Sequence, residues 1–171
     1  MKTETASRYV AGLALLIFGS TGQAAEKQAQ PYVMAVLEDH AHGRLVLEGS
    51  DEAAIAEITR GRTEENYDFD DSLALCVAYT RTRQLEAAAS ACDAAMEKST
   101  SRSDRTRWIR RGPTAMGYTG RSNFALASIN RGVLYALTGE SEQAAEAFEA
   151  ALAAKPGFDA AETNLARVSS K

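Results

Sequence analysis

Residue types that interrupt helices and strands are scarce in this chain of 171 residues. It has only three prolines and twelve glycines, and alanine is abundant, so helix is favoured over strand. The composition is 45% hydrophobic and 25% charged, which is ordinary for one globular domain. An excess of basic residues is also missing, because the net charge is −4. Nucleic acid is therefore not expected as a partner.

Long hydrophobic runs are missing as well. Residues 9–18 form an apolar run of ten residues, about half of the ~20 that a transmembrane helix needs. This run follows the basic Lys2 and Arg8 and precedes small residues that end at Ala25, a pattern typical of a signal peptide over residues 1–25. We therefore expect export, to the bacterial periplasm. The alternatives are an uncleaved anchor or an amphipathic start to the fold.

Catalytic and cofactor-binding motifs are absent from the sequence. It contains no nucleophile elbow, phosphate-binding loop, dinucleotide fingerprint or zinc-ligand spacing. Carboxylates are plentiful, but they fall at positions typical of solvated helix surfaces. We expect neither an enzyme nor a cofactor.

What the chain does contain is a pair of helical patterns within residues 125–158. Apolar residues recur at helical spacing on both sides of a turn at Gly139, and Pro156 ends the second pattern. Characteristic residue types stand at Gly132, Tyr135, Gly139, Ala144, Phe148, Ala151 and Pro156. These types at these spacings resemble a tetratricopeptide repeat. Two positions depart from the family pattern, with Ser128 where a large aromatic is usual and Arg131 where leucine is usual.

Steps of 34 residues place further repeats before this one. The resemblance then implies an all-α solenoid of antiparallel helix pairs, with a C-terminal capping helix. The expected parts are a lead-in at 26–34, repeats at 35–68, 69–102 and 125–158, an insertion at 103–124 and the capping helix at 159–171. In the weak first repeat, the apolar periodicity predicts one helix from Val33 to Leu47 and a second that ends near Gly61.

The two cysteines of the chain, Cys76 and Cys92, lie symmetrically about a turn near Gln84. On an antiparallel helix pair such residues are level with each other, and both occupy inward positions. In an oxidising compartment we expect them to form a disulfide. The alternative is a pair of buried free thiols.

His40 and His42 follow two acidic residues and raise the question of a metal site. Residues i and i+2 of a helix point about 200° apart, so both histidines could not easily reach one ion. We therefore expect no metal and interpret this segment as a helix surface with one half-buried histidine.

The insertion reverses the local charge of an otherwise acidic chain. Its basic patch consists of Arg105, Arg107, Trp108, Arg110 and Arg111. Such a patch is typical of a site for an acidic partner, an anionic lipid headgroup or a cell-wall polymer. The alternative is a solvated extension of the preceding helix plus a loop, with Trp108 packed on the body of the protein.

The resemblance also implies a peptide-binding groove, formed in this family by the first helix of each repeat. The matching residues are Leu73, Val77, Arg81, Ile129, Val133 and Ala136. This face is mostly apolar and would suit an extended or helical apolar segment. The residues by which some relatives hold a C-terminal carboxylate are absent. Alternatively, these side chains pack against the N-terminal segment or under the insertion.

We therefore expect an exported protein-interaction module that binds a protein or peptide through the groove, the insertion or both. A binder of anionic lipid or cell-wall polymer and a structural accessory subunit are the alternatives. Peripheral membrane contact and self-association stay open at this point.

Overall fold

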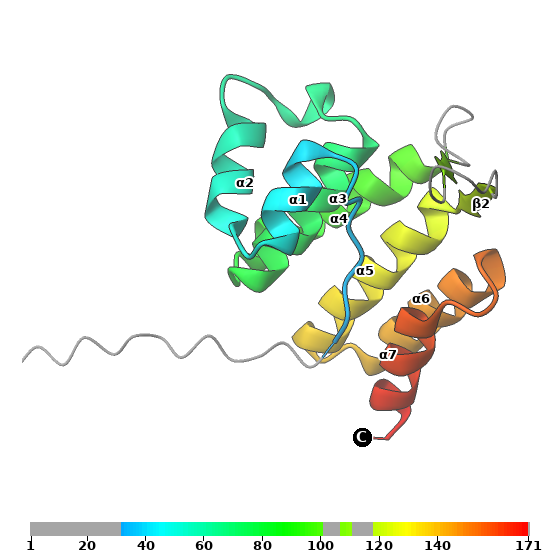
Figure 1. Ribbon diagram of the computed structural model, residues 1–171. Coiled ribbons are helices and arrows are strands. Elements are labelled where there is room, and N and C mark those ends of the chain that lie inside the picture. Colours follow the sequence, from blue (N-terminus) through cyan, green and yellow to red (C-terminus); the bar gives the residue numbers. More distant parts are fainter. Residues whose placement is uncertain (1–31, 101–106, 111–117, 171) are drawn as a thin grey trace, which may run out of the picture.

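The computed structural model describes residues 32–100, 107–110 and 118–170 and is shown in Figure 1. Most of these residues are helical, as the sequence predicts, and one short pair of strands is also present. The elements are α1 (Ala41–Leu47), α2 (Asp51–Thr59), the 3-10 turn η1 (Glu64–Asn66), α3 (Phe69–Arg81), α4 (Leu85–Ser99), β1 (Arg107–Arg110), β2 (Tyr118–Arg121), α5 (Asn123–Thr138), α6 (Ser141–Ala154) and α7 (Asp159–Ser169).

The helices pack mainly on their neighbours along the chain. α1 packs on α2, α3 on α4, α5 on α6 and α6 on α7, while α4 also packs on α5. Side-chain caps mark the starts of two central helices. The Asp68 carboxylate accepts a bond from the Asp71 backbone N–H before α3, and the Ser122 hydroxyl does the same for Ala125 before α5. Each cap satisfies a helix N–H that has no partner within the helix.

Close approach between α5 and α6 depends on a glycine. A Cβ atom built on Gly132 would lie 2.6 Å from Cε1 of Phe148. The Phe148 ring is fully buried, in a cluster with Ile129 and Val133 of α5. The ring therefore occupies the space that a side chain at position 132 would need.

Replacing Gly132 with alanine should lower the free energy of unfolding by about 1–2 kcal/mol. Overpacking of a filled core costs about 1–3 kcal/mol, and the better helix propensity of alanine offsets up to about 1 kcal/mol of this loss. Urea denaturation would measure the change. Phe148→Leu should cost less in the Gly132→Ala background than in the wild type, and equal costs would show that the two side chains do not compete for space.

The predicted pairing of Cys76 with Cys92 is confirmed. Their Sγ atoms are 2.06 Å apart and join α3 to α4 across a separation of 16 residues. Both cysteines are buried in the cluster that also holds Val46 and Ile58 from the first helix pair. The crosslink thus lies inside the core of the N-terminal half.

Reduction of this disulfide should lower the free energy of unfolding by about 3 kcal/mol, the value expected for closing a loop of this length. Denaturation with and without dithiothreitol would measure the loss. A Cys76→Ala/Cys92→Ala variant is the matched control, because its stability should not respond to the reductant. An equal response in both proteins would contradict the prediction.

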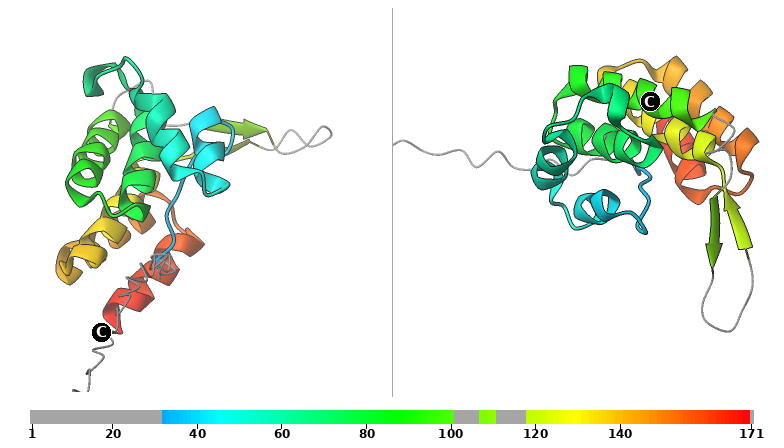
Figure 2. Two further views of the ribbon diagram at one scale, coloured as in Figure 1. Left: turned by 90° about the vertical axis from the view of Figure 1, so that its left-hand side faces the viewer. Right: turned by 90° about the horizontal axis from the view of Figure 1, so that it is seen from above.

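The insertion is not the helical extension plus loop that was one expectation from its sequence. β1 and β2 pair as antiparallel strands, with Arg107 opposite Arg121 and Arg110 opposite Tyr118. Figure 2 shows this hairpin standing away from the helices. Strand pairing satisfies backbone groups that a helical extension of α4 would have satisfied internally.

The helix predicted from Val33 to Leu47 is also wrong in its first part. α1 begins only at Ala41, and residues 32–37, here called the strap, form no helix. In Figure 1 the strap runs as a drawn-out segment from α1 across α5. The periodic apolar side chains that suggested a helix are instead distributed along the strap.

Candidate functional site

The strap lies over one side of α3 and α5, the side that carries Leu73, Ile129 and Val133. This side is called the inner face below. Tyr32 and Leu37, at its two ends, are 6% and 2% exposed. Tyr32 belongs to the apolar cluster of Ile129 and Val133, and Leu37 to that of Leu73. The chain therefore covers its own inner face with an N-terminal segment.

Two asparagine side chains hold the backbone of the strap. Asn130 of α5 accepts a hydrogen bond from the Ala35 N–H at 2.7 Å and donates one to the Ala35 carbonyl at 2.7 Å. Asn164 of α7 makes the same pair of bonds with Val33, at 2.8 and 2.7 Å. Both amides are fully buried. Each one thus satisfies the N–H and the carbonyl of a single strap residue.

This arrangement recognises backbone rather than side chains. The bonded residues Val33 and Ala35 are two apart, which is the spacing at which successive residues of an extended chain face the same way. A side-chain amide has one acceptor and two donors, so it can pair with both polar groups of a peptide unit. Any residue except proline could take either place, while apolar contacts beside it would select the sequence.

Five of the six residues predicted to form the groove, all except Arg81, belong to or pack against the three apolar clusters that also include residues of the strap. Leu73, Val77, Ile129 and Val133 are at most 2% exposed, and Ala136 is partly buried. The alternative noted from the sequence, packing against the N-terminal segment, therefore describes their state in this structure.

Arg81, the one charged member of the predicted groove, is engaged within the chain. Its Nε lies 3.2 Å from Oδ2 of Asp51, whose side chain is fully buried, and its Nη1 donates to the Val46 carbonyl at 2.8 Å. These bonds join the end of α3 to the first helix pair. Arg81 thus acts as a structural link here.

The strap ends against a glycine of α1. A Cβ atom on Gly43 would collide with the carbonyl oxygen of Leu37 and would lie 2.8 Å from its carbonyl carbon. The close contact explains why position 43 is a glycine. It lets α1 approach the backbone of the strap.

Beside the strap a hollow of about 200 Å³ remains open. Its walls come from the strap, from α1 and from α3. The lining residues are Tyr32, Met34, Val36, Val46, Leu47, Val77 and Arg81. Leu47 is 56% exposed at its rim. The inner face therefore keeps apolar space next to the strap.

A second hollow, of about 270 Å³, lies where α4, α5 and α6 meet. Ser128 and Arg131, the two departures from the family pattern, both line it. Small Ser128 leaves space that a large aromatic would fill. Arg131 reaches outward, with Nη2 3.2 Å from Oδ1 of Asp93 and Nε donating to the Tyr135 hydroxyl at 3.0 Å.

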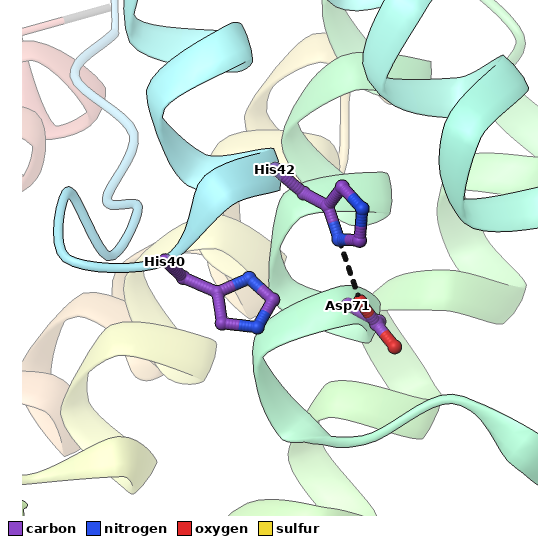
Figure 3. Close-up of side chains that lie close together, drawn as sticks. All are labelled: His40, His42 and Asp71. Carbon is purple, nitrogen blue, oxygen red and sulfur yellow. Dashed lines mark hydrogen bonds and ion pairs between the residues drawn. The ribbon is translucent and has the colours of Figure 1, made fainter.

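The two histidines approach each other, contrary to the expectation from helix geometry. Their ring centroids are 5.3 Å apart, because His40 precedes α1 as its N-cap in extended conformation while His42 lies inside the helix. Both rings project toward Asp71 at the start of α3, as Figure 3 shows. The 200° argument fails because only one of the two residues is helical.

Two sets of sequence predictions lie outside what the structure describes. In the basic patch, Arg105 and Arg111 are outside the described residues, and Arg107, Trp108 and Arg110 are described only as backbone of β1. The signal-peptide segment, residues 1–25, is outside as well. None of the described helices has both the length and the apolar character needed to span a membrane.

Comparison with known proteins adds no relative. No family model, no curated protein and no solved structure matches this chain. The resemblance to tetratricopeptide repeats accordingly stays a prediction, and the site has to be interpreted from its own geometry.

Asn130 and Asn164 are the strap-binding residues that sequence reasoning missed. A signal was present, since they are 34 residues apart, the length of the repeat that the sequence resembles. A polar residue at a repeated inward position is unusual unless it has a partner. The partner, however, is the backbone of a segment about 100 residues away, which no local pattern indicates.

Replacing Asn164 with alanine should lower the free energy of unfolding by about 1–3 kcal/mol, because the Val33 N–H and carbonyl would lose their partners at a buried site. Thermal and urea denaturation would measure the loss. Asn66→Ala is the matched control, since the Asn66 side chain is exposed and bonds only to Thr63. Similar losses in both variants would contradict a special role for Asn164.

Proposed function

We propose that this protein is an interaction module of the tetratricopeptide type, whose inner face binds an extended, largely apolar segment of a partner protein in the place of the strap. The observation that carries the proposal is the paired bonding of Asn130 and Asn164 to strap backbone. This contact would serve a partner segment equally well, because it does not depend on the side chains of the bound residues.

The apolar surroundings support a partner segment with buried side chains. The inner face already accommodates Tyr32 and Leu37. Met34 and Val36, between them, line the open hollow together with Val77. Burial of two or three such side chains contributes about 1.5–3 kcal/mol each, and the amide bonds fix the register of the segment.

The strap acts as an internal competitor in this proposal. A partner binds only the fraction of molecules whose strap has left the inner face, so its apparent affinity is reduced by that fraction. Val33 is 42% exposed although its backbone is held. Release of the strap would uncover the apolar clusters and the two amides beneath it, and these are the groups that a partner segment would contact.

We also propose that the protein works after export, in an oxidising compartment such as the bacterial periplasm. The buried disulfide between Cys76 and Cys92 supports this location, because structural disulfides persist where thiols are not kept reduced.

A strap-release variant tests the proposed function. Val33→Pro/Ala35→Pro removes the two N–H groups that bond to Asn164 and Asn130 but leaves the inner face unchanged. A fluorescent peptide with the sequence of residues 31–38 should bind this variant at least about ten-fold more tightly than it binds the wild type, as measured by fluorescence anisotropy. The peptide can then occupy the vacated face.

Val33→Thr/Ala35→Ser is the matched control, because it keeps both N–H groups and similar volumes. It should bind the peptide as weakly as the wild type does. Adding Asn130→Ala and Asn164→Ala to the proline variant should abolish binding. If the proline variant keeps its helical circular dichroism but does not bind the peptide, or binds it without the two amides, the proposal is wrong.

A further inference from the structure

Two histidines and two aspartates meet where the chain leaves the strap and α3 begins. They are His40, His42, Asp70 and Asp71, and the chain has only two histidines in all. Figure 3 shows the two rings with Asp71. The cluster lies outside the inner-face contacts described above.

The distances in this cluster are short. His42 Nδ1 lies 2.8 Å from Oδ1 of Asp71, and His40 Nε2 lies 3.9 Å from Oδ2 of Asp70. One nitrogen from each histidine and one oxygen of Asp71 all lie within 4.8 Å of one another. Ligand atoms of a tetrahedral zinc site, with bonds of ~2.1 Å, are ~3.4 Å apart. Side-chain rotations that move these three atoms by about an ångström would therefore bring all of them within bonding distance of one ion.

The donor atoms suit a metal. Nδ1 of His40 is buried and has no hydrogen-bond partner among the described residues. Asp71 supplies a carboxylate, a group that coordinates divalent metal ions.

The carboxylate of Asp71 is also held in position. Its Oδ2 accepts a bond from Nη2 of Arg62 at 2.6 Å and faces the backbone N–H of Asp68 at 3.4 Å in the cap of α3. Its other oxygen, Oδ1, therefore faces Nδ1 of His42. Oriented supporting bonds of this kind are typical of metal ligands.

We propose that His40, His42 and Asp71 form a binding site for a divalent transition-metal ion of the zinc type. Two imidazoles with one carboxylate are a ligand set that zinc prefers, with a water molecule in the fourth position. Calcium and magnesium prefer oxygen ligands throughout and fit this set poorly. Asp70, beside His40, is placed to orient that ring.

Binding would link two parts of the chain that are otherwise joined by weaker contacts. His40 lies three residues beyond the end of the strap at Leu37, whereas Asp71 belongs to the first turn of α3. An ion held between them would fasten the C-terminal end of the strap to the central helices. Since the ion binds the folded arrangement, it would also raise the melting temperature.

Titration of the purified, tag-free protein with zinc chloride tests the proposal by isothermal calorimetry. We expect one ion per chain and a dissociation constant in the micromolar range or below. His40→Gln and His42→Gln should each weaken binding by at least about ten-fold. Glu38→Gln is the matched control, because this exposed carboxylate lies in the same segment but not in the set. Cobalt(II) should give the visible absorption of tetrahedral coordination in the wild type and in Glu38→Gln, but not in His40→Gln or His42→Gln.

His40→Gln is the decisive variant, because the Nδ1 atom that it removes has no hydrogen-bond partner among the described residues, and Nε2 lies 3.9 Å from Asp70, too far for a hydrogen bond. Its circular dichroism and melting temperature without zinc should match those of the wild type. If His42→Gln destabilises the fold through loss of the bond to Asp71, His40→Gln decides alone. Absence of zinc binding to the wild type, or unchanged affinity in His40→Gln, would overturn the proposal.

Discussion

Four hydrogen bonds between two buried side-chain amides and the strap backbone hold the strap on the inner face. Asn130 and Asn164 come from different helix pairs, and the strap is the segment that spans them. Without these bonds, the polar groups of Val33 and Ala35 would lie against an apolar face with no partner, which costs more than the burial of a few side chains returns. The position of the strap, and with it the state of the inner face, follows from these amides.

Several other features of the structure depend on the strap lying where it does. Gly43 is needed because α1 packs against the carbonyl of Leu37. Deflection of the chain at His40 brings both histidines toward Asp71. The proposed peptide site and the proposed metal site thus lie at the middle and at the end of one segment. A metal at the end would hold that segment in place, whereas a partner peptide would displace it.

The helical architecture could largely be predicted from the sequence. Apolar periodicity predicted the helix pair within residues 125–158, and the 34-residue step of the resemblance placed helices from residue 69 and from residue 159, each to within a few residues. The close pair Gly132 and Phe148 was also predictable, since a small residue opposite a large one is visible at fixed spacing. The disulfide followed from the symmetry of two cysteines about a turn. The helix expected before Ala41 was wrong because a few apolar residues at helical spacing cannot distinguish a helix from a non-helical segment that packs its side chains on the core.

The sequence by itself therefore determined the helix pairs, their crosslink and the apolar character of the inner face, because these depend on neighbours a few residues or one hairpin apart. Only the tertiary structure decided what covers that face and which polar groups meet at its edge. Asn130 bonds to a residue 95 positions away and Asn164 to one 131 positions away. The pairing of His42 with Asp71 likewise needs two helices to be brought together. Contacts of this range depend on how the whole chain packs, and no local pattern of side chains specifies them.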